Sequence, residues 1–237
     1  MDNYHGPDTS RLQKVRNKGL VPPDEVNKWD PVPSTSPGFP RFHRRAAGYK
    51  TNGEHIGKVD IRSARCFGSE WINCDFDGTR MALSDFRSSR FISSSFSGCS
   101  ASATVFDSTS FDHVNFYECD LEQSSFATSV LTNCLFEGCR LSYATFSGSI
   151  VKECVFRVCD FRGGNLDFVE TKNVHFEDCN FWSVVASFGC QFWNATFDAD
   201  AMKMFAALLA RKDPDPRLIE YAGEKYEQVK KLMAVED

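Results

Sequence analysis

The chain has 237 residues, enough for one or two domains with a buried core, and a formal net charge of -5. Residues 56–198 hold eleven Lys/Arg against eighteen Asp/Glu, whereas residues 1–55 hold nine against six. This acidic central region argues against direct nucleic-acid binding. The polar start MDNYHGPDTS has no apolar core, and no apolar run approaches the roughly 20 residues that span a bilayer. These features predict a cytoplasmic protein that does not associate with membranes.

Residues 1–55 show no hydrophobic period and contain seven of the nine prolines. Proline fixes the backbone and removes a hydrogen-bond donor, so this composition predicts an extended or flexible N-terminal arm. Four basic side chains lie close together in it: Arg41, His43, Arg44 and Arg45. They either bind phosphate or an acidic surface, or are simply solvated, and the sequence leaves both open.

Residues 56–198 repeat with a period of five. Stepping by five from Ile61 to Phe181 gives 25 positions, and all are large and apolar except Cys66, Ala101 and Thr171. A small side chain usually stands two positions before each large one. Neither a helix, with about 3.6 residues per turn, nor a strand, with a period of two, explains this spacing. The distance from Phe181 to Phe192 is eleven, which indicates one inserted residue near 185–189.

This series resembles the pentapeptide-repeat family, whose unit is roughly small-polar-Leu/Phe-x-x. The resemblance implies an all-β solenoid, a right-handed quadrilateral β-helix in which four pentapeptides form one square coil. The large residue and the small residue two before it would point inward, and residues twenty apart would lie above one another. The physical requirements agree, because large side chains must fill such a coil and stacked coils pair each other's backbone groups.

Ten cysteines fall mostly at the small inward position. A zinc site needs four converging ligands, usually from short spacings, whereas the closest spacing here is five. We therefore interpret the cysteines as small buried hydrophobes, rather than as a metal or redox ladder, and expect no cofactor. One column of residues twenty apart consists of Cys99, Cys119, Cys139, Cys159 and Cys179.

Residues 199–237 predict α-helices. The segment DADAMKMFAALLAR reads as a helix that ends at DPDP, and Asp215-Pro216 is a suitable start for a second one. Two roles are open for this segment. It would cap the last coil, whose apolar interior and unpaired backbone need cover. By resemblance to family members with C-terminal helices, it would form a homodimer.

Catalysis is not expected. The five histidines are scattered, and the sequence contains no phosphate-binding glycine loop, no HExxH and no GxSxG. A rod filled with phenylalanine also leaves no room for a substrate. The primary interpretation is a rigid scaffold or interaction rod for a protein partner of unknown identity.

Some outward positions are aliphatic although they should face water, and these form a candidate partner-binding patch. The alternative is that they are scattered surface residues with β-propensity. The patch lies around one corner, with Val130 and Ile150 stacked on one face and Leu135, Val155 and Val158 on the next.

The resemblance implies an alternative function, since some family members mimic duplex DNA and bind type II topoisomerases such as DNA gyrase, which modulates the enzyme or confers quinolone resistance. The acidic charge has the right sign, and about seven coils at ~4.8 Å give a rod comparable to one turn of B-DNA. Against it, Asp120, Arg140 and Asp160 share a face and partly neutralise one another, and the large loops of some resistance proteins are missing. The candidate acidic strip consists of Asp75, Asp77, Glu118, Glu137, Glu177 and Asp178.

Overall fold

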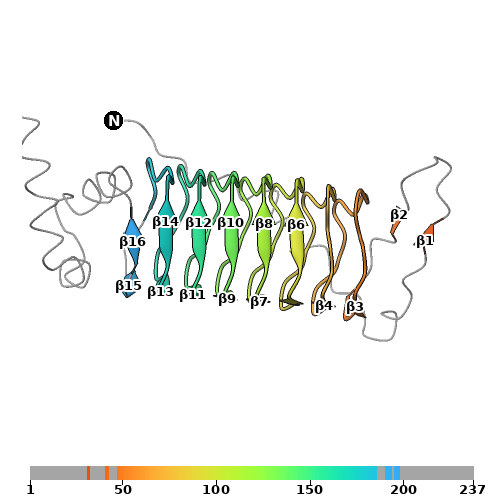
Figure 1. Cartoon of the computed structure of the whole chain (residues 1–237). Coiled ribbons are helices and arrows are strands. Elements are labelled where there is room, and N and C mark those ends of the chain that lie inside the picture. The colour runs from red at the N-terminus through yellow and green to blue at the C-terminus, as the bar shows by residue number, and fades with distance from the viewer. Residues whose placement is uncertain (1–30, 33–40, 43–46, 186–189, 194, 198–237) are drawn as a thin grey trace, which may run out of the picture.

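The computed structural model describes residues 31–32, 41–42, 47–185, 190–193 and 195–197. Residues 47–197 of this set form a rod of about seven stacked coils (Figure 1). Within the rod each inner strand pairs in parallel with the strands of the coils before and after it, and the strands at the ends of each sheet have one such partner. The register is twenty residues per coil, as in Phe96↔Phe116 and Phe116↔Phe136. The expected all-β quadrilateral solenoid is thus confirmed.

Two of the four sides of the rod are regular parallel sheets, which we call face 1 and face 2. Face 1 is the eight-stranded sheet of β3 (Lys50–Asn52), β4 (Glu70–Ile72), β5 (Arg90–Ile92), β7 (Ser110–Asp112), β9 (Val130–Thr132), β11 (Ile150–Lys152), β13 (Glu170–Lys172) and β15 (Gln191–Trp193). Face 2 is the six-stranded sheet of β6 (Ser95–Ser97), β8 (Asn115–Tyr117), β10 (Leu135–Glu137), β12 (Val155–Arg157), β14 (His175–Glu177) and β16 (Thr196–Phe197).

The other two sides, face 3 and face 4, are held by single bridges between successive coils. On face 3 these bridges run from Asp60 to Asn180, and on face 4 they run from Arg65 to Val185, again in steps of twenty. The final step is longer, because Thr171 pairs with Phe192 and Phe176 pairs with Phe197, both 21 residues away. The predicted insertion is therefore present, and the strand pairing continues beyond it.

The chain turns at corners that lie two residues after each central side chain. Most of these corner residues have a positive φ, for example 51° at Asn73 and 59° at Ser63. Glycine, asparagine and other small residues tolerate this left-handed conformation best. The corners nevertheless also hold Leu83, Glu118 and Tyr143, so the fold imposes this conformation on residues that seldom adopt it.

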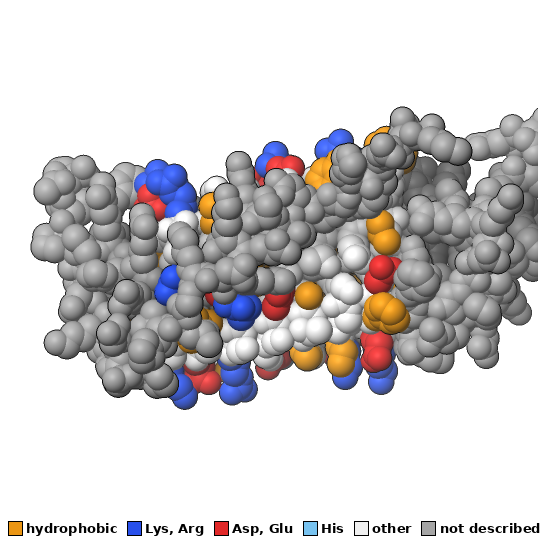
Figure 2. Space-filling model, turned by 180° about the vertical axis from the view of Figure 1, so that it is seen from behind, with side chains coloured by type: hydrophobic (Ala, Val, Ile, Leu, Met, Phe, Trp, Pro, Cys, Tyr) orange, Lys and Arg blue, Asp and Glu red, His pale blue; other side chains and the backbone are white. Residues whose placement is uncertain are grey.

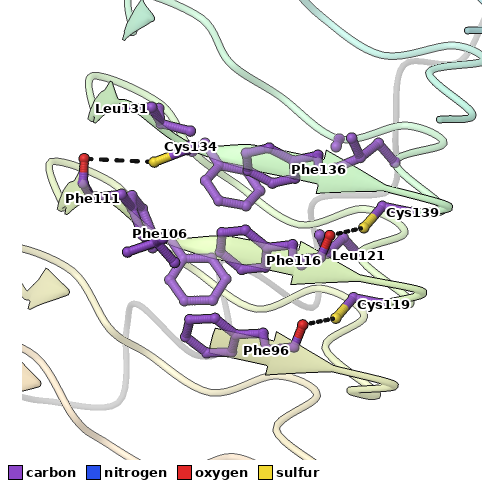
Figure 3. Close-up of a cluster of buried hydrophobic side chains, with 14 of the residues drawn as sticks. Phe96, Phe106, Phe111, Phe116, Cys119, Leu121, Leu131, Cys134, Phe136 and Cys139 are labelled. Atoms are coloured by element: carbon purple, nitrogen blue, oxygen red, sulfur yellow. Dashed lines mark hydrogen bonds between the residues drawn. The ribbon is translucent and has the colours of Figure 1, made fainter. Parts of the chain in front are cut away.

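The interior is filled by columns of stacked rings, of which the phenylalanine column of face 2 is the longest. Ring centroids of Phe96 and Phe116 lie 4.6 Å apart, and those of Phe116 and Phe136 lie 4.4 Å apart (Figure 3). These are favourable distances for parallel rings. Burying each ring contributes about 1.5–3 kcal/mol, so the columns supply most of the hydrophobic stabilisation.

The interior is less complete near the C-terminal end. There the central residues of face 1 become Val151 and Thr171, and a small apolar cavity lies beside them. The Thr171 side chain is 3% exposed, yet its hydroxyl has no hydrogen-bond partner. The cavity is lined by Phe146, Val151, Phe156, Phe161, Leu166, Val169, Thr171 and Phe176.

The structure differs from the sequence interpretation at the N-terminal boundary. Strand β3 belongs to face 1 and pairs with β4, so parallel stacking starts before the predicted first residue, 56. Within the predicted arm, β1 (Pro31–Val32) and β2 (Arg41–Phe42) pair antiparallel. The predicted helices in 199–237 lie outside the described residues, as do His43, Arg44 and Arg45 of the basic cluster. In the part of the chain that is described, no helix has the length and apolarity needed to cross a membrane.

Candidate protein-interaction face

The negative charge of the rod is concentrated on one of its four faces. Single bridges from His55 to Asp75 and from Asp75 to Ser95 extend face 2 by two coils before β6. With the corner that follows it, face 2 therefore comprises residues 55–58 and their equivalents every twenty residues up to 175–178. This face holds six Asp/Glu and two Lys/Arg, a net charge of -4. Face 1 (50–53 to 170–173) and face 3 (60–63 to 180–183) each hold four Asp/Glu and four Lys/Arg. Face 4 (65–68 to 165–168) holds three Asp/Glu and two Lys/Arg.

Every residue of the candidate acidic strip lies on face 2. Asp75 is bridged to Ser95 at the start of the face, and Glu177 belongs to β14 near its end. Asp75 is partly engaged, since its carboxylate lies 2.9 Å from Nδ1 of His55. Among the described residues, Asp77 and Glu118 form no ion pair. The fold therefore gathers the predicted acids along one side of the rod.

Arg157 interrupts this acidic face. In the register of face 2 it lies between Glu137 and Glu177, and its guanidinium is 3.7 Å and 2.7 Å from their carboxylates. The hydrogen bond to Glu177 raises the pKa of Arg157. Two of the six acids of face 2 are thus paired with Arg157 of the same face. The charge count along the sequence does not reveal this pairing.

The faces beside face 2 differ because their charges form balanced ladders. On face 3, Arg140 binds Asp120 at 3.0 Å and Glu122 at 2.7 Å. Asp60 accepts hydrogen bonds from Arg62, which lower the pKa of the Asp60 carboxyl. On the side of the rod seen in Figure 2, basic and acidic side chains lie next to one another. The predicted mutual neutralisation on face 3 is present.

The aliphatic patch predicted from the sequence is divided between two faces. Val130 pairs with Ile150 on face 1, and Leu135 pairs with Val155 on face 2. Polar outward residues separate the pairs along the chain, including Thr132 and Lys152. Leu135 and Val155 therefore share the acidic face with Val158 at its corner and with the partly exposed ring of Tyr117 on β8.

Val158 lies at the corner that follows face 2 and combines two unfavourable features. Its side chain is 56% exposed, and its φ is 52°, a conformation that is an outlier for a β-branched residue. The equivalent positions in the coils before it are mostly glycine, including Gly98 and Gly138. Phe168 has the same combination at another corner, with 56% exposure and a φ of 58°. A rule for left-handed corners could have singled out Phe168 from the sequence, which the hydrophobic period alone did not do.

The cysteines are part of the wall of the rod. All ten are free and buried, and the column at the corner between faces 2 and 3 donates S–H hydrogen bonds to the phenylalanine carbonyls of face 2. Cys119 Sγ lies 3.3 Å from the carbonyl oxygen of Phe96 (Figure 3). Thr79 makes the equivalent bond to Ile56 at 2.7 Å. Cysteine thus substitutes for serine or threonine as a small inward donor.

The described residues contain no group of three or more His, Cys, Asp or Glu side chains that could hold a metal ion. What they form is a rod with four flat faces, of which face 2 carries most of the net negative charge. A four-sided parallel solenoid of this kind defines a repeat protein whose inside is fixed and whose outer faces are free to vary.

Sequence comparison agrees with this class. Residues 67–146 match the family described as "Pentapeptide repeat region", and residues 139–182 match the one described as "Pentapeptide repeats (8 copies)". The chain is therefore a member of the pentapeptide-repeat family. No curated protein sequence matches it.

Three solved structures illustrate the similarity. QnrB1, a plasmid-mediated fluoroquinolone resistance protein, is 16% identical over 64% of this chain and 94% of its own, with a TM-score of 0.42. HetL, a pentapeptide repeat protein involved in heterocyst differentiation regulation in the cyanobacterium Nostoc sp. strain PCC 7120, is 11% identical over 62% and 89%, with a TM-score of 0.29. Rfr23 from the cyanobacterium Cyanothece 51142 is 9% identical over 63% and 91%, with a TM-score of 0.27.

Proposed function

We propose that this protein is a non-catalytic interaction rod that binds a basic protein partner through face 2. The observation that carries the proposal is the uneven charge, with a net -4 on face 2 and zero on faces 1 and 3. A single-signed surface attracts oppositely charged partners and orients their approach. Balanced faces lack this long-range attraction.

The apolar side chains on the same face supply the second component of binding. Leu135 and Val155 are neighbours on β10 and β12, and Val158 is exposed at the adjoining corner. Interfaces gain much of their affinity from a few desolvated apolar or aromatic anchors, while rim charges mainly set the association rate. Face 2 carries both kinds of group.

The proposal is tested by capturing partners from an extract of the native cell with two triple variants. One replaces three acids of face 2: Asp75→Asn, Asp77→Asn and Glu118→Gln. The matched control makes the same charge change on face 3: Asp120→Asn, Glu122→Gln and Asp160→Asn. We expect the face 2 variant to retain about a tenth or less of the captured partner, equivalent to about 1.4 kcal/mol, and the face 3 variant to behave as wild type.

Circular dichroism must show that both triple variants fold. Capture should also weaken as salt is raised, because exposed charges are screened over about 10 Å at 0.1 M. If the two variants lose the same amount of partner, or if neither loses any, face 2 is not the binding surface and the proposal is wrong.

DNA gyrase is one specific candidate for the basic partner. The resemblance noted above and the acidic face support it. The balanced charges of faces 1 and 3 oppose it, because duplex DNA is negative all around its circumference. A supercoiling assay with and without a quinolone decides the matter, and unchanged gyrase activity at micromolar protein would exclude this candidate while leaving the proposal for face 2 intact.

A further inference from the structure

The dimensions of face 2 restrict the shape of a partner that uses all of it. Each strand of the face is at most three residues long, so the face is about 10 Å wide. Its acids are spread along the rod, since Asp77 and Glu177 stand five coils apart, or about 24 Å at ~4.8 Å per coil. A partner segment that reaches both must be narrow and must lie along the rod axis.

An α-helix has the required width and repeat. Its overall diameter is about 10–12 Å, and its turns recur about every 5.4 Å, close to the ~4.8 Å between coils. An extended strand presents side chains on one side about every 6.8 Å, so its side chains fall out of register with coils spaced ~4.8 Å apart within a few residues. Five coils correspond to about 16 helical residues at 1.5 Å per residue.

The order of groups along face 2 defines the pattern that such a helix must show. Asp75 and Asp77 lie at one end, Leu135 and Val155 lie three to four coils further on, and Glu177 lies one coil beyond Val155. A complementary helix therefore carries basic residues towards both ends of one side and apolar residues between them, nearer to one end. This is a basic amphipathic helix.

Val158 fits the position of an anchor for this helix. It is exposed and holds a left-handed φ although the corners around it are mostly glycine or acidic. The side chain of Glu118 leans over Gly138, where an added Cβ would lie 3.4 Å from Glu118 Cγ. An apolar group at Val158 thus has acids on both sides along the corner, at Glu118 and Asp178.

We infer that face 2 binds a basic amphipathic helix laid along the rod axis, with its apolar residues on Leu135, Val155 and Val158. This inference rests on the proposed function, because it specifies the partner element that the acidic face recognises. It excludes an extended basic segment or a partner that binds by charge alone.

The test uses two synthetic peptides of about 20 residues and identical composition, rich in Lys, Leu and Ala. One places its lysines and leucines on a single helical side in the order given above, and the other alternates them so that no helical side forms. We expect the patterned peptide to bind the full-length chain at least tenfold more tightly in fluorescence anisotropy. Its helical circular dichroism should also rise on binding.

Two single variants identify the face. Val158→Ala should weaken binding of the patterned peptide about fivefold and leave the alternating peptide unchanged. Val130→Ala, the same truncation of an exposed valine on face 1, is the matched control and should leave both unchanged. Arg157→Gln should strengthen binding several-fold because it frees Glu137 and Glu177, whereas Arg140→Gln on face 3, with the same charge change, should not.

Equal affinities for the two peptides, or no binding of the patterned one at low salt, would overturn the helix inference. So would Val158→Ala and Val130→Ala having the same effect. These outcomes are distinguishable from failure of the proposed function, which is judged by capture of the native partner with the two triple variants.

Discussion

The coils between residues 71 and 136 and those between residues 146 and 181 follow one repeat but fill their interiors differently. In the first region face 1 contributes a third aromatic column, with Phe91 and Phe111 stacked at 5.3 Å. In the second region face 1 contributes Val151 and Thr171, and the rings move to face 3, where Phe161 and Phe181 stack at 5.0 Å. Opposite faces thus compensate for each other's volume.

The compensation is complete only in the first region. There the ring opposite a small residue is large, as with Phe111 and Ala101, and both residues are at most 1% exposed. In the second region a cavity remains beside Thr171, whereas buried hydroxyls without a partner occur in both regions, at Ser124 in the first and at Ser149 and Thr171 in the second. Large or β-branched residues hold left-handed corners in both regions, at Leu83 and Thr128 in the first and at Val158 and Phe168 in the second. Among the candidate binding residues, Val155 and Val158 lie in this second region, whereas Asp75, Glu118 and Leu135 lie in the first.

The largest effect that separates the two regions is expected from core truncation. Phe116→Ala should lower the free energy of unfolding by about 3–5 kcal/mol, because the ring packs between Phe96 and Phe136 and its loss leaves a cavity. Val151→Ala removes a smaller group beside an existing cavity and should lower it by about 1–2 kcal/mol. Urea unfolding followed by circular dichroism measures both. Equal losses would show that the two regions are packed equally well.

A smaller effect of opposite sign is expected at Thr171. Thr171→Val removes a buried hydroxyl without a partner and should raise the free energy of unfolding by about 1–2 kcal/mol. Thr109→Val is the control, because the Thr109 hydroxyl donates to the Phe86 carbonyl at 2.8 Å and its loss should destabilise by about 1 kcal/mol. Destabilisation by both changes would mean that Thr171 is satisfied in solution.

The smallest effect near neutral pH concerns the buried thiols in the wall of the rod. Burial raises the pKa of Cys66 above its ordinary 9.0, and contact with Cys119 together with burial raises the pKa of Cys139 to about 12. The unfolded chain releases these protons first, so the stabilisation is fully present below pH 9 and is lost as pH rises towards 12. Urea unfolding at pH 7, 9 and 10.5 should show this decline.

Replacing one thiol sharpens the same prediction. Cys139→Ser keeps a donor for the Phe116 carbonyl, which Cys139 Sγ now meets at 3.4 Å, and removes the titrating group. The variant should therefore fold and lose less stability above pH 9 than wild type. In native wild-type protein, thiol reagents should react far more slowly than in urea, because thiolate formation is disfavoured in the interior. Rapid labelling of most thiols without unfolding contradicts buried, protonated cysteines.

Much of the fold follows from the five-residue period, because it fixes which side chains point inward. Stepping by twenty then assigns residues to faces, which is why the acids from Asp75 to Asp178 fall together. The start of the rod did not follow, because position 51 carries threonine instead of a large apolar residue although β3 pairs normally. A hydrophobic pattern cannot predict a strand that is paired mainly through backbone hydrogen bonds.

The candidate site was only partly predictable for a similar reason. The sequence placed Val130 and Ile150 on one face and Leu135 and Val155 on the next, and the strand pairing agrees with both stacks. It gave no sign, however, that Arg157 reaches both Glu137 and Glu177, since the rotamer of a long side chain depends on its neighbours in space. Backbone strain at Val158 is likewise a property of the corner and not of the residue type.

The 21-residue step near the end of the rod shows where such a molecule tolerates growth. The extra residue enters between Val185 and Cys190, while Thr171 and Phe176 still find their partners in the next coil. A parallel coil therefore tolerates an added residue between two of its faces, because backbone pairing with the neighbouring coil restores the register. Insertions of this kind change the outline of the molecule at intervals set by the spacing of the coils.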